Sequence, residues 1–353
     1  MKPMHIEELT QTRSVLGESP MWDVDTDRLF WVDSLGRKIF RAAPDGSDLL
    51  EMDVPANLGS IALCRGGGLI GAFKTGLHFV DVDSGALTPI GNPELDLPNN
   101  TLNDGKVDAA GRFWFGSMNI TEAEPSGTLY RLDPDLSLTK ILGNITVSNG
   151  PCWSADGRRF YFGDSTTRLI TAFDFDLALG TLSRPRPFFS SPFDPPSTVD
   201  GATVDAEGYL WSAQVYSGRI VRVAPDGTLD RTIEMTTPAV TSVMFGGPDL
   251  DTLFVTSMAR PLKADLLHAS DTSAAPCLPF TGWAYAGGPN RNSQSNRLRD
   301  PAASSFNANS GNKSRPLTPP CGDPLHERSF PQPWALRPAR PPAELLVRRG
   351  IAA

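Results

Sequence analysis

The feature of this chain that most constrains its fold is a short pattern that occurs six times, at intervals of roughly 40 to 50 residues. In each copy, an acidic or glycine-containing turn leads into a strand of aromatic and β-branched residues. The copies are residues 25–32, 66–70, 108–115, 155–162, 205–211 and 247–255. A repeat of this length made only of strands and tight turns is typical of a β-propeller, whose blades are four-stranded sheets. The pattern therefore predicts an all-β, six-bladed β-propeller.

A second hairpin follows each of the first five aromatic strands, with turns at 44–46, 83–85, 133–135, near Asp176 and at 225–227. The sixth copy has its aromatic strand, but the pattern stops near Pro261. Residues 262–353 contain 13 prolines and few β-branched residues, a composition that does not predict a packed sheet. We therefore expect a propeller domain over 1–261 and an irregular tail over 262–353. The last blade could be incomplete, and residues 6–15 could supply its closing strand.

Charge and composition exclude several classes of function. Residues 1–261 carry 21 Lys and Arg against 34 Asp and Glu, a net charge of −13 (21 − 34), whereas a nucleic-acid surface needs clustered cations. No run of 18 apolar residues predicts a membrane span, and no secretory signal is recognisable at the start. Cys64, Cys152, Cys277 and Cys321 show no metal or disulfide spacing. The expectation is a cytoplasmic protein with no nucleic-acid or membrane partner.

Four polar clusters interrupt the strands at corresponding positions of successive units. They contain Glu18, the Asn103-Asp104 pair, Asn149 and Asp200. Equivalent positions in successive blades face the same mouth of a propeller's central channel, where carboxylate and amide oxygens would suit a hard or borderline divalent cation. As single dipeptides, Asn-Gly and Asp-Gly are also ordinary hairpin turns. The metal site and the turn remain alternative interpretations.

These segments resemble one family. They are 16–20, 102–108, 111–118, 148–150, 199–201 and 245–247, and they are similar to the regucalcin, gluconolactonase and luciferin-regenerating-enzyme family of six-bladed propellers, in particular its bacterial sugar-acid lactonases. The resemblance implies that Glu18, Asn149 and Asp200 bind one divalent ion (Ca, Zn, Mn, Mg or Fe(II)). It also implies that Asn103 contacts the substrate and that Asp200 acts as acid and base. The family commonly has an arginine where this chain has Thr101, which could still hydrogen-bond a substrate hydroxyl.

The function that this resemblance implies is metal-dependent hydrolysis of an aldonolactone such as xylono-, arabinono- or gluconolactone. The alternatives are a metal-binding regulatory propeller without catalysis and a related esterase or phosphotriesterase. A GxGxxG match at 66–71 lacks the helix that dinucleotide binding needs. Lys74 and Lys106 are expected to be solvated or rim residues, with contact to a sugar acid's carboxylate as the alternative. The sequence does not predict the oligomeric state.

Overall fold

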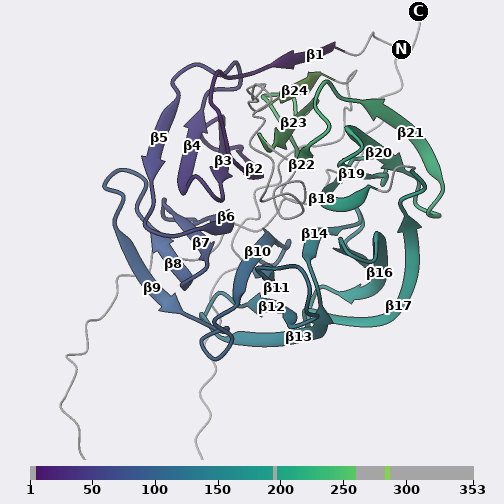
Figure 1. Cartoon of the computed structure of the whole chain (residues 1–353), viewed down its shortest axis with the longest axis horizontal. Helices are drawn as coiled ribbons and strands as arrows, with labels where there is room; N and C mark the ends of the chain where they lie inside the picture. The colour runs from purple at the N-terminus through teal and green to yellow at the C-terminus, as the bar shows by residue number, and fades with distance from the viewer. Residues whose placement is uncertain (1–4, 194–196, 260–282, 287–353) are drawn as a thin grey trace, which may run out of the picture.

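In the computed structural model, antiparallel β-strands pair into four-stranded sheets that are arranged around one axis (Figure 1). The structure describes residues 5–193, 197–259 and 283–286, and this part of the chain contains no helix. The predicted all-β propeller is therefore confirmed.

Five blades are each built from four consecutive strands, as the sequence predicted. They are β2 (Gly17–Asp23), β3 (Arg28–Asp33), β4 (Lys38–Ala42) and β5 (Leu50–Asp53); β6 (Leu58–Leu63), β7 (Leu69–Phe73), β8 (Gly76–Val80) and β9 (Leu87–Gly91); β10 (Asn100–Val107), β11 (Phe113–Asn119), β12 (Gly127–Leu132) and β13 (Leu138–Ile145); β14 (Ser148–Trp153), β15 (Arg159–Asp164), β16 (Leu169–Asp176) and β17 (Thr181–Ser190); and β18 (Thr198–Val204), β19 (Leu210–Val215), β20 (Arg219–Val223) and β21 (Leu229–Glu234).

The predicted turns form because their backbone hydrogen bonds and φ angles suit a tight turn. In the turn at 44–46, the backbone N–H of Gly46 donates to Ala43 O at 2.9 Å and that of Ala43 to Ser47 O at 2.8 Å. Gly46 has a φ of +81°, which glycine adopts without the steric cost of a side chain. The Asp-Gly signal in the sequence therefore located this hairpin.

The remaining sheet differs from the other five because its strands come from distant parts of the chain. It contains β22 (Val240–Gly246), β23 (Thr252–Ser257), β24 (Trp283–Ala286) and, at its outer edge, β1 (His5–Glu8). The prediction of six regular blades is thus confirmed for five, and the sixth position holds a composite sheet. Residues 283–286 form a strand inside the segment that the sequence indicated as irregular. The rest of the predicted 262–353 tail lies outside the described residues.

The innermost strands bring the sheets together around the axis. They are β2, β6, β10, β14, β18 and β22, and each packs against the innermost strand on either side, as Figure 1 shows. The first and last sheets meet directly, since the Thr241 hydroxyl donates to Gly17 O at 2.5 Å and Leu16 pairs with Met258. The ring is therefore closed along its inner wall.

Aromatic side chains fill the space between neighbouring blades. Trp22 of β2 stacks on Phe254 of β23 with ring centroids 5.7 Å apart, and Trp114 of β11 lies 5.3 Å from Phe160 of β15. Such large rings bury much apolar area and prefer offset or tilted contacts. The strand pattern that defines the repeat is thus the pattern that packs blade against blade.

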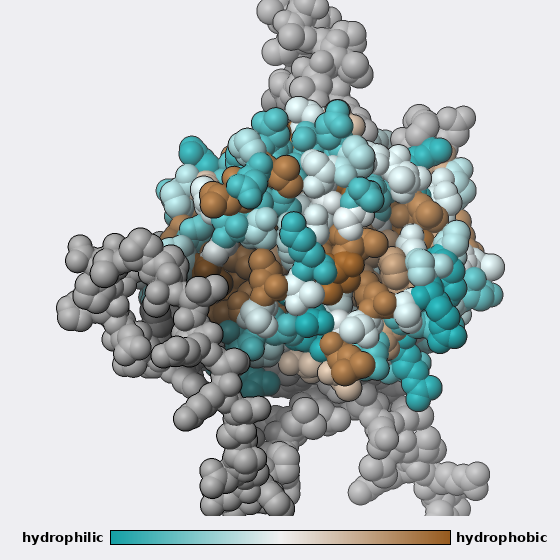
Figure 2. All heavy atoms as spheres, turned by 90° about the horizontal axis from the view of Figure 1, so that it is seen from below, coloured by the Kyte–Doolittle hydropathy of each residue, from teal (hydrophilic) through white to brown (hydrophobic). Residues whose placement is uncertain are grey.

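The outer surface is less apolar than these interfaces. Figure 2, which views the ring from the side of β13, shows hydrophilic side chains interspersed with apolar ones, and Leu138 and Leu142 of β13 are exposed. Scattered surface leucines are normal for a folded domain. No helix in the described ranges is long and apolar enough to cross a membrane.

Candidate functional site

A β-bulge breaks the innermost strand of every sheet near its beginning, and the predicted site residues lie at four of these bulges. The pairing register shifts between Glu18 and Met21, Leu102 and Gly105, Asn149 and Cys152, and Val199 and Ala202. A bulge inserts unpaired residues and redirects their side chains. The corresponding positions that the sequence predicted are therefore confirmed as one structural device. We call Glu18, Asn103, Asp104, Asn149 and Asp200 the axial cluster.

Hydrogen bonds join the two asparagines of the axial cluster directly. The Asn103 Nδ2 donates to Asn149 Oδ1 at 3.2 Å and to Ser148 O at 2.8 Å. Asn149 Nδ2 donates in turn to the Ser165 hydroxyl at 2.8 Å, which donates to Val199 O at 2.6 Å. Since its amide nitrogen is held by Ser165, Asn149 presents its amide oxygen toward Asn103. The network connects β10, β14 and β18.

Asp104 fixes the backbone beside Asn149. Its carboxylate accepts the N–H of Gly105 at 2.8 Å and the N–H of Gly150, in the next blade, at 2.9 Å. Gly150 has a φ of +60°, and a Cβ there would lie 2.9 Å from Asp200 O. A larger residue would be strained and would push β14 away from β18. Asp104 and Gly150 together therefore bring Asn149 and Asp200 close.

The carboxyl groups of the axial cluster influence one another across the ring. Burial raises the pKa of Glu18 well above its ordinary value, and the charges of Asp200 and Asp104 raise it further. Burial and the charge of Asp104 likewise raise the pKa of Asp200. Residues 182 positions apart in the sequence (200 − 18) thus lie within electrostatic reach. In the absence of a cation, Glu18 and Asp200 therefore release their protons less readily than exposed carboxyl groups do.

One lysine opposes this accumulation of negative charge. Lys106 is half-buried, and its amine donates to Ala202 O on β18. Burial raises the pKa of both Glu18 and Asp104, and the charge of Lys106 partly opposes this rise. Lys106 is therefore not fully solvated, and its place at the rim stays a prediction. The charge of Glu122, like that of Asp104, raises the pKa of Asp200. The Asn103-Asp104-Gly105-Lys106 run contained the signal for Asp104 and Lys106, whereas nothing in the repeat pointed to Glu122.

Thr101 is the predicted site residue that is least connected to the others. It lies on β10 opposite Met118, and its hydroxyl donates to Leu102 O at 3.3 Å. Within the described residues, no hydrogen bond joins it to Glu18, Asn103, Asn149 or Asp200. Its assignment to substrate binding stays a prediction.

The donor set of the axial cluster fits a divalent cation. Two carboxylates, Glu18 and Asp200, and the amide oxygen of Asn149 are ligands that Ca²⁺ and similar ions accept, and a cation would relieve the repulsion that raises the two pKa values. No group of three or more His, Cys, Asp or Glu side chains in the described part of the chain is placed to hold a metal. Glu18 and Asp200 would therefore need the amide oxygen of Asn149 as a third protein ligand.

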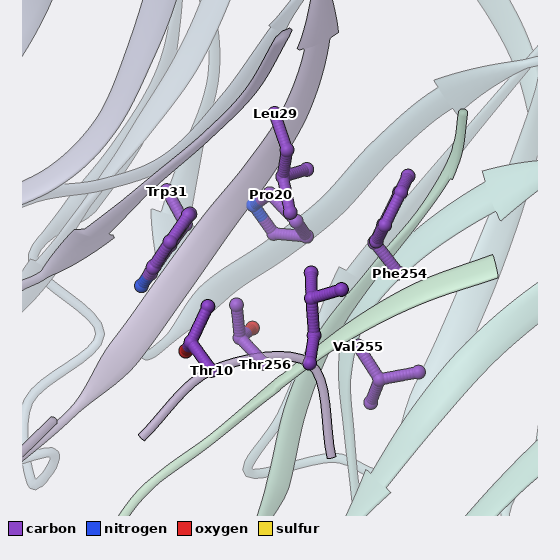
Figure 3. A pocket seen from close by; sticks show the side chains of 8 residues that line it. Thr10, Pro20, Leu29, Trp31, Phe254, Val255 and Thr256 are labelled. Carbon is purple, nitrogen blue, oxygen red and sulfur yellow. The ribbon is translucent and has the colours of Figure 1, made fainter. Parts of the chain in front are cut away.

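A small cavity at the seam between the first and last sheets is not part of this site. It has a volume of about 10 Å³ and is lined by Leu9, Thr10, Pro20, Leu29, Trp31, Phe254, Val255 and Thr256. Figure 3 shows the mostly apolar side chains that surround it. A cavity of this size could hold one water at most, and an apolar lining offers such a water few partners. It is a packing feature of ring closure.

The raised pKa values predict how stability depends on pH in the metal-free protein. Because the folded state holds protons on Glu18 and Asp200 more tightly than the unfolded state, folded stability should decrease as pH rises above about 4. We expect a lower urea midpoint at about pH 8 than at about pH 5 with chelator present. The Glu18→Gln, Asp200→Asn double variant should lose part of this slope, with the rest left by Asp104, whose pKa is also raised by burial. Surface aspartates with lowered pKa, such as Asp45 and Asp81, act below about pH 4 and do not interfere.

Comparison with known proteins agrees with the fold. Residues 16–259 match the family described as SMP-30/Gluconolactonase/LRE-like region. Regucalcin of Xenopus laevis is 34% identical over 272 residues, which cover 75% of this chain and 90% of that protein. The 6-deoxy-6-sulfogluconolactonase of Pseudomonas putida is 33% identical over 256 residues, covering 72% and 87%.

The solved structure of a calcium-binding protein, regucalcin from Agrobacterium tumefaciens, superposes with a TM-score of 0.70 at 26% identity, covering 80% of this chain and 92% of that one. The fold and the matched residues thus define a β-propeller of this type. The chain belongs to the SMP-30/gluconolactonase/LRE-like family, and the resemblance in the sequence is confirmed.

Proposed function

We propose that the protein is a divalent-metal-dependent lactonase that hydrolyses a sugar-acid lactone to the open-chain acid. The observation that supports the proposal is that Glu18, Asn149 and Asp200 lie at equivalent bulges of three innermost strands, and that the charge of Asp200 raises the pKa of Glu18. The relative named 6-deoxy-6-sulfogluconolactonase supports a sugar lactone as the substrate class. We also propose that the protein acts on this small molecule in the cytoplasm and has no nucleic-acid or membrane partner.

The bound cation would supply Lewis acidity for the lactone carbonyl and for the attacking water. Asp200 would take a proton from that water and return it to the ring oxygen as the ester bond breaks. One lone pair of its carboxylate is already used by the N–H of Gly201 at 2.9 Å, which fixes its orientation.

Asn103 would contact the substrate through its carbonyl oxygen. Both of its N–H donors have acceptors already, in Ser148 O and Asn149 Oδ1, so the free side of the amide accepts hydrogen bonds. A sugar hydroxyl is the matching donor. Thr101 would add a weaker, single contact to a second hydroxyl.

Removal of divalent metal is expected to abolish hydrolysis of gluconolactone and pentonolactones. The reason is that the axial cluster itself holds only carboxylates and amides, and the amine of the neighbouring Lys106 is held by Ala202 O. The measurement is lactone hydrolysis after dialysis against chelator, followed by return of Ca²⁺, Zn²⁺, Mn²⁺, Mg²⁺ or Fe²⁺ one at a time. Recovery with one ion would identify it, and unchanged turnover in the chelated protein would refute metal dependence. Simple aryl esters and phosphotriesters in the same panel test the related esterase activities.

A regulatory metal-binding propeller without catalysis is the second candidate. It is favoured by the names of the relatives, since regucalcin recurs among them and one solved neighbour is called a calcium-binding protein. Such a protein would bind the cation but leave every lactone of the panel intact. Direct metal titration beside the hydrolysis assay separates the two candidates.

A further inference from the structure

A groove lies on the same end of the ring as the axial cluster. It has a volume of about 550 Å³ and is lined by Arg37, Pro55, Ala56, Asn57, Lys74, Thr75, Asn92 and Leu95, which we call the rim groove. These residues precede β6 and β10 or lie in the β3–β4 and β7–β8 turns. In antiparallel blades, such segments share the end at which the innermost strands begin. Because Glu18, Asn103, Asn149 and Asp200 are near the beginnings of their strands, groove and cluster face the same way.

The rim groove also adjoins the axial cluster in space. Its residue Asn57 is two positions before Gly59, where a Cβ would lie 2.4 Å from the Cα of Asn103. The Lys74 amine donates to Asn100 O at 3.3 Å and to Pro98 O at 3.1 Å. Asn100 and Asn103 are three residues apart on β10, a span of about 10 Å. A six-carbon lactone with a terminal substituent could therefore reach from Asn103 to Lys74.

The lining of the rim groove is cationic although the propeller region is acidic. Arg37 and Lys74 contribute two positive charges, and no carboxylate lines the groove, whereas residues 1–261 carry a net charge of −13 (21 − 34). The carboxylate of Asp53 is near Arg37 but is paired with Lys38 at 2.8 Å. Its pKa is lowered mainly by that hydrogen bond and to a smaller extent by the charge of Arg37. Lys74 uses two of its three N–H donors on backbone carbonyls, so one remains for a ligand. Asn57, Asn92 and Thr75 add neutral polar groups suited to hydroxyls.

Resting on the lactonase function proposed above, we propose that the rim groove binds an anionic substituent of the substrate, so that the preferred substrate is a lactone with a carboxylate, sulfonate or phosphate at its far end. Arg37 and Lys74 are then specificity-determining residues. They hold the anionic group by charge-assisted hydrogen bonds, while the ester carbonyl lies at the axial cluster. A neutral lactone uses the axial cluster alone.

The test compares three lactones on the wild-type protein: neutral gluconolactone, glucarolactone, which carries a carboxylate, and phosphorylated gluconolactone. At least one anionic lactone is expected to have a kcat/KM about tenfold or more above the neutral one. Arg37→Gln and Lys74→Met should each remove most of this advantage and leave gluconolactone within about twofold. Lys140→Gln, a lysine on the outer strand β13, is the matched control and should change neither substrate.

Two outcomes would contradict different parts of the proposal, the groove assignment and the lactonase function. Equal kcat/KM for neutral and anionic lactones, with no selective effect of Arg37→Gln, overturns the groove assignment and leaves the lactonase function standing. Hydrolysis of no lactone at all overturns the lactonase function itself. If Lys74→Met also slows gluconolactone hydrolysis, because Pro98 O and Asn100 O lose their hydrogen-bond donor, the result for Arg37→Gln decides. Among the described residues the Arg37 side chain makes no hydrogen bond that this substitution would break. Calorimetric binding of phosphogluconate in chelator, weakened by Arg37→Gln, checks the groove without turnover.

Discussion

Replacement of Asp200 by asparagine is expected to lower kcat for sugar-lactone hydrolysis by about three orders of magnitude or more. Asparagine keeps the shape of the side chain and can still accept the N–H of Gly201, which Asp200 accepts at 2.9 Å. It cannot take a proton from water or return one to the ring oxygen, and it removes one negative ligand from the cluster. The effect should therefore fall on kcat at saturating metal rather than on folding.

The measurement is kcat at increasing concentrations of the activating ion, together with the metal dissociation constant of the same variant. Asp226→Asn, in an exposed turn where the carboxylate only accepts Thr228 at 3.0 and 2.7 Å, is the matched control and should keep wild-type kcat. A variant Asp200→Asn with wild-type turnover would exclude this residue as acid and base. A wild-type protein that binds metal but turns over no lactone would instead support the regulatory candidate.

The second large effect is expected on stability, at Asp108. This carboxylate is fully buried and accepts the N–H groups of Ala110 at 2.9 Å and Arg112 at 3.0 Å. It also accepts the Arg112 Nε at 2.6 Å and the indole N–H of Trp114 at 2.9 Å. Asp108→Ala leaves a buried guanidinium without its partner, which should lower the free energy of unfolding by about 3–5 kcal/mol.

Urea unfolding of metal-loaded protein at neutral pH measures this loss. Asp133→Ala is the control, because Asp133 pairs with Arg131 at 2.7 Å in a more exposed position and should cost about 1 kcal/mol or less. Asp205 repeats the arrangement two blades later, accepting Trp211 Nε1 and Arg222 Nε, both at 2.8 Å. We expect Asp205→Ala to be comparably destabilising. Changes below about 1 kcal/mol at both aspartates would show that these networks do not hold the blades.

These two aspartates show how far the repeat explains the fold. Each closes the turn between the first and second strands of its blade and accepts the indole of the tryptophan six residues later. The turn, the strand and the contact between aspartate and tryptophan are specified by residues close together in the sequence, so the alternation and the Asp-Gly turns were sufficient to predict five blades. The composite sheet of β1, β22, β23 and β24 was harder, because β1 and β24 are hundreds of residues apart and their pairing depends on closure of the whole ring.

The axial cluster, too, was predicted in part from the sequence and in part became visible only in the structure. The sequence by itself determined which oxygen-bearing residues occupy corresponding positions in successive blades, because strand period and turn chemistry are local. Only the tertiary structure decided that Asp104 holds Gly150, that Lys106 crosses to β18, and that Arg37 and Lys74 share a groove. These contacts join blades whose relative placement depends on inter-blade packing and ring closure, and a local pattern carries no information about long-range distances.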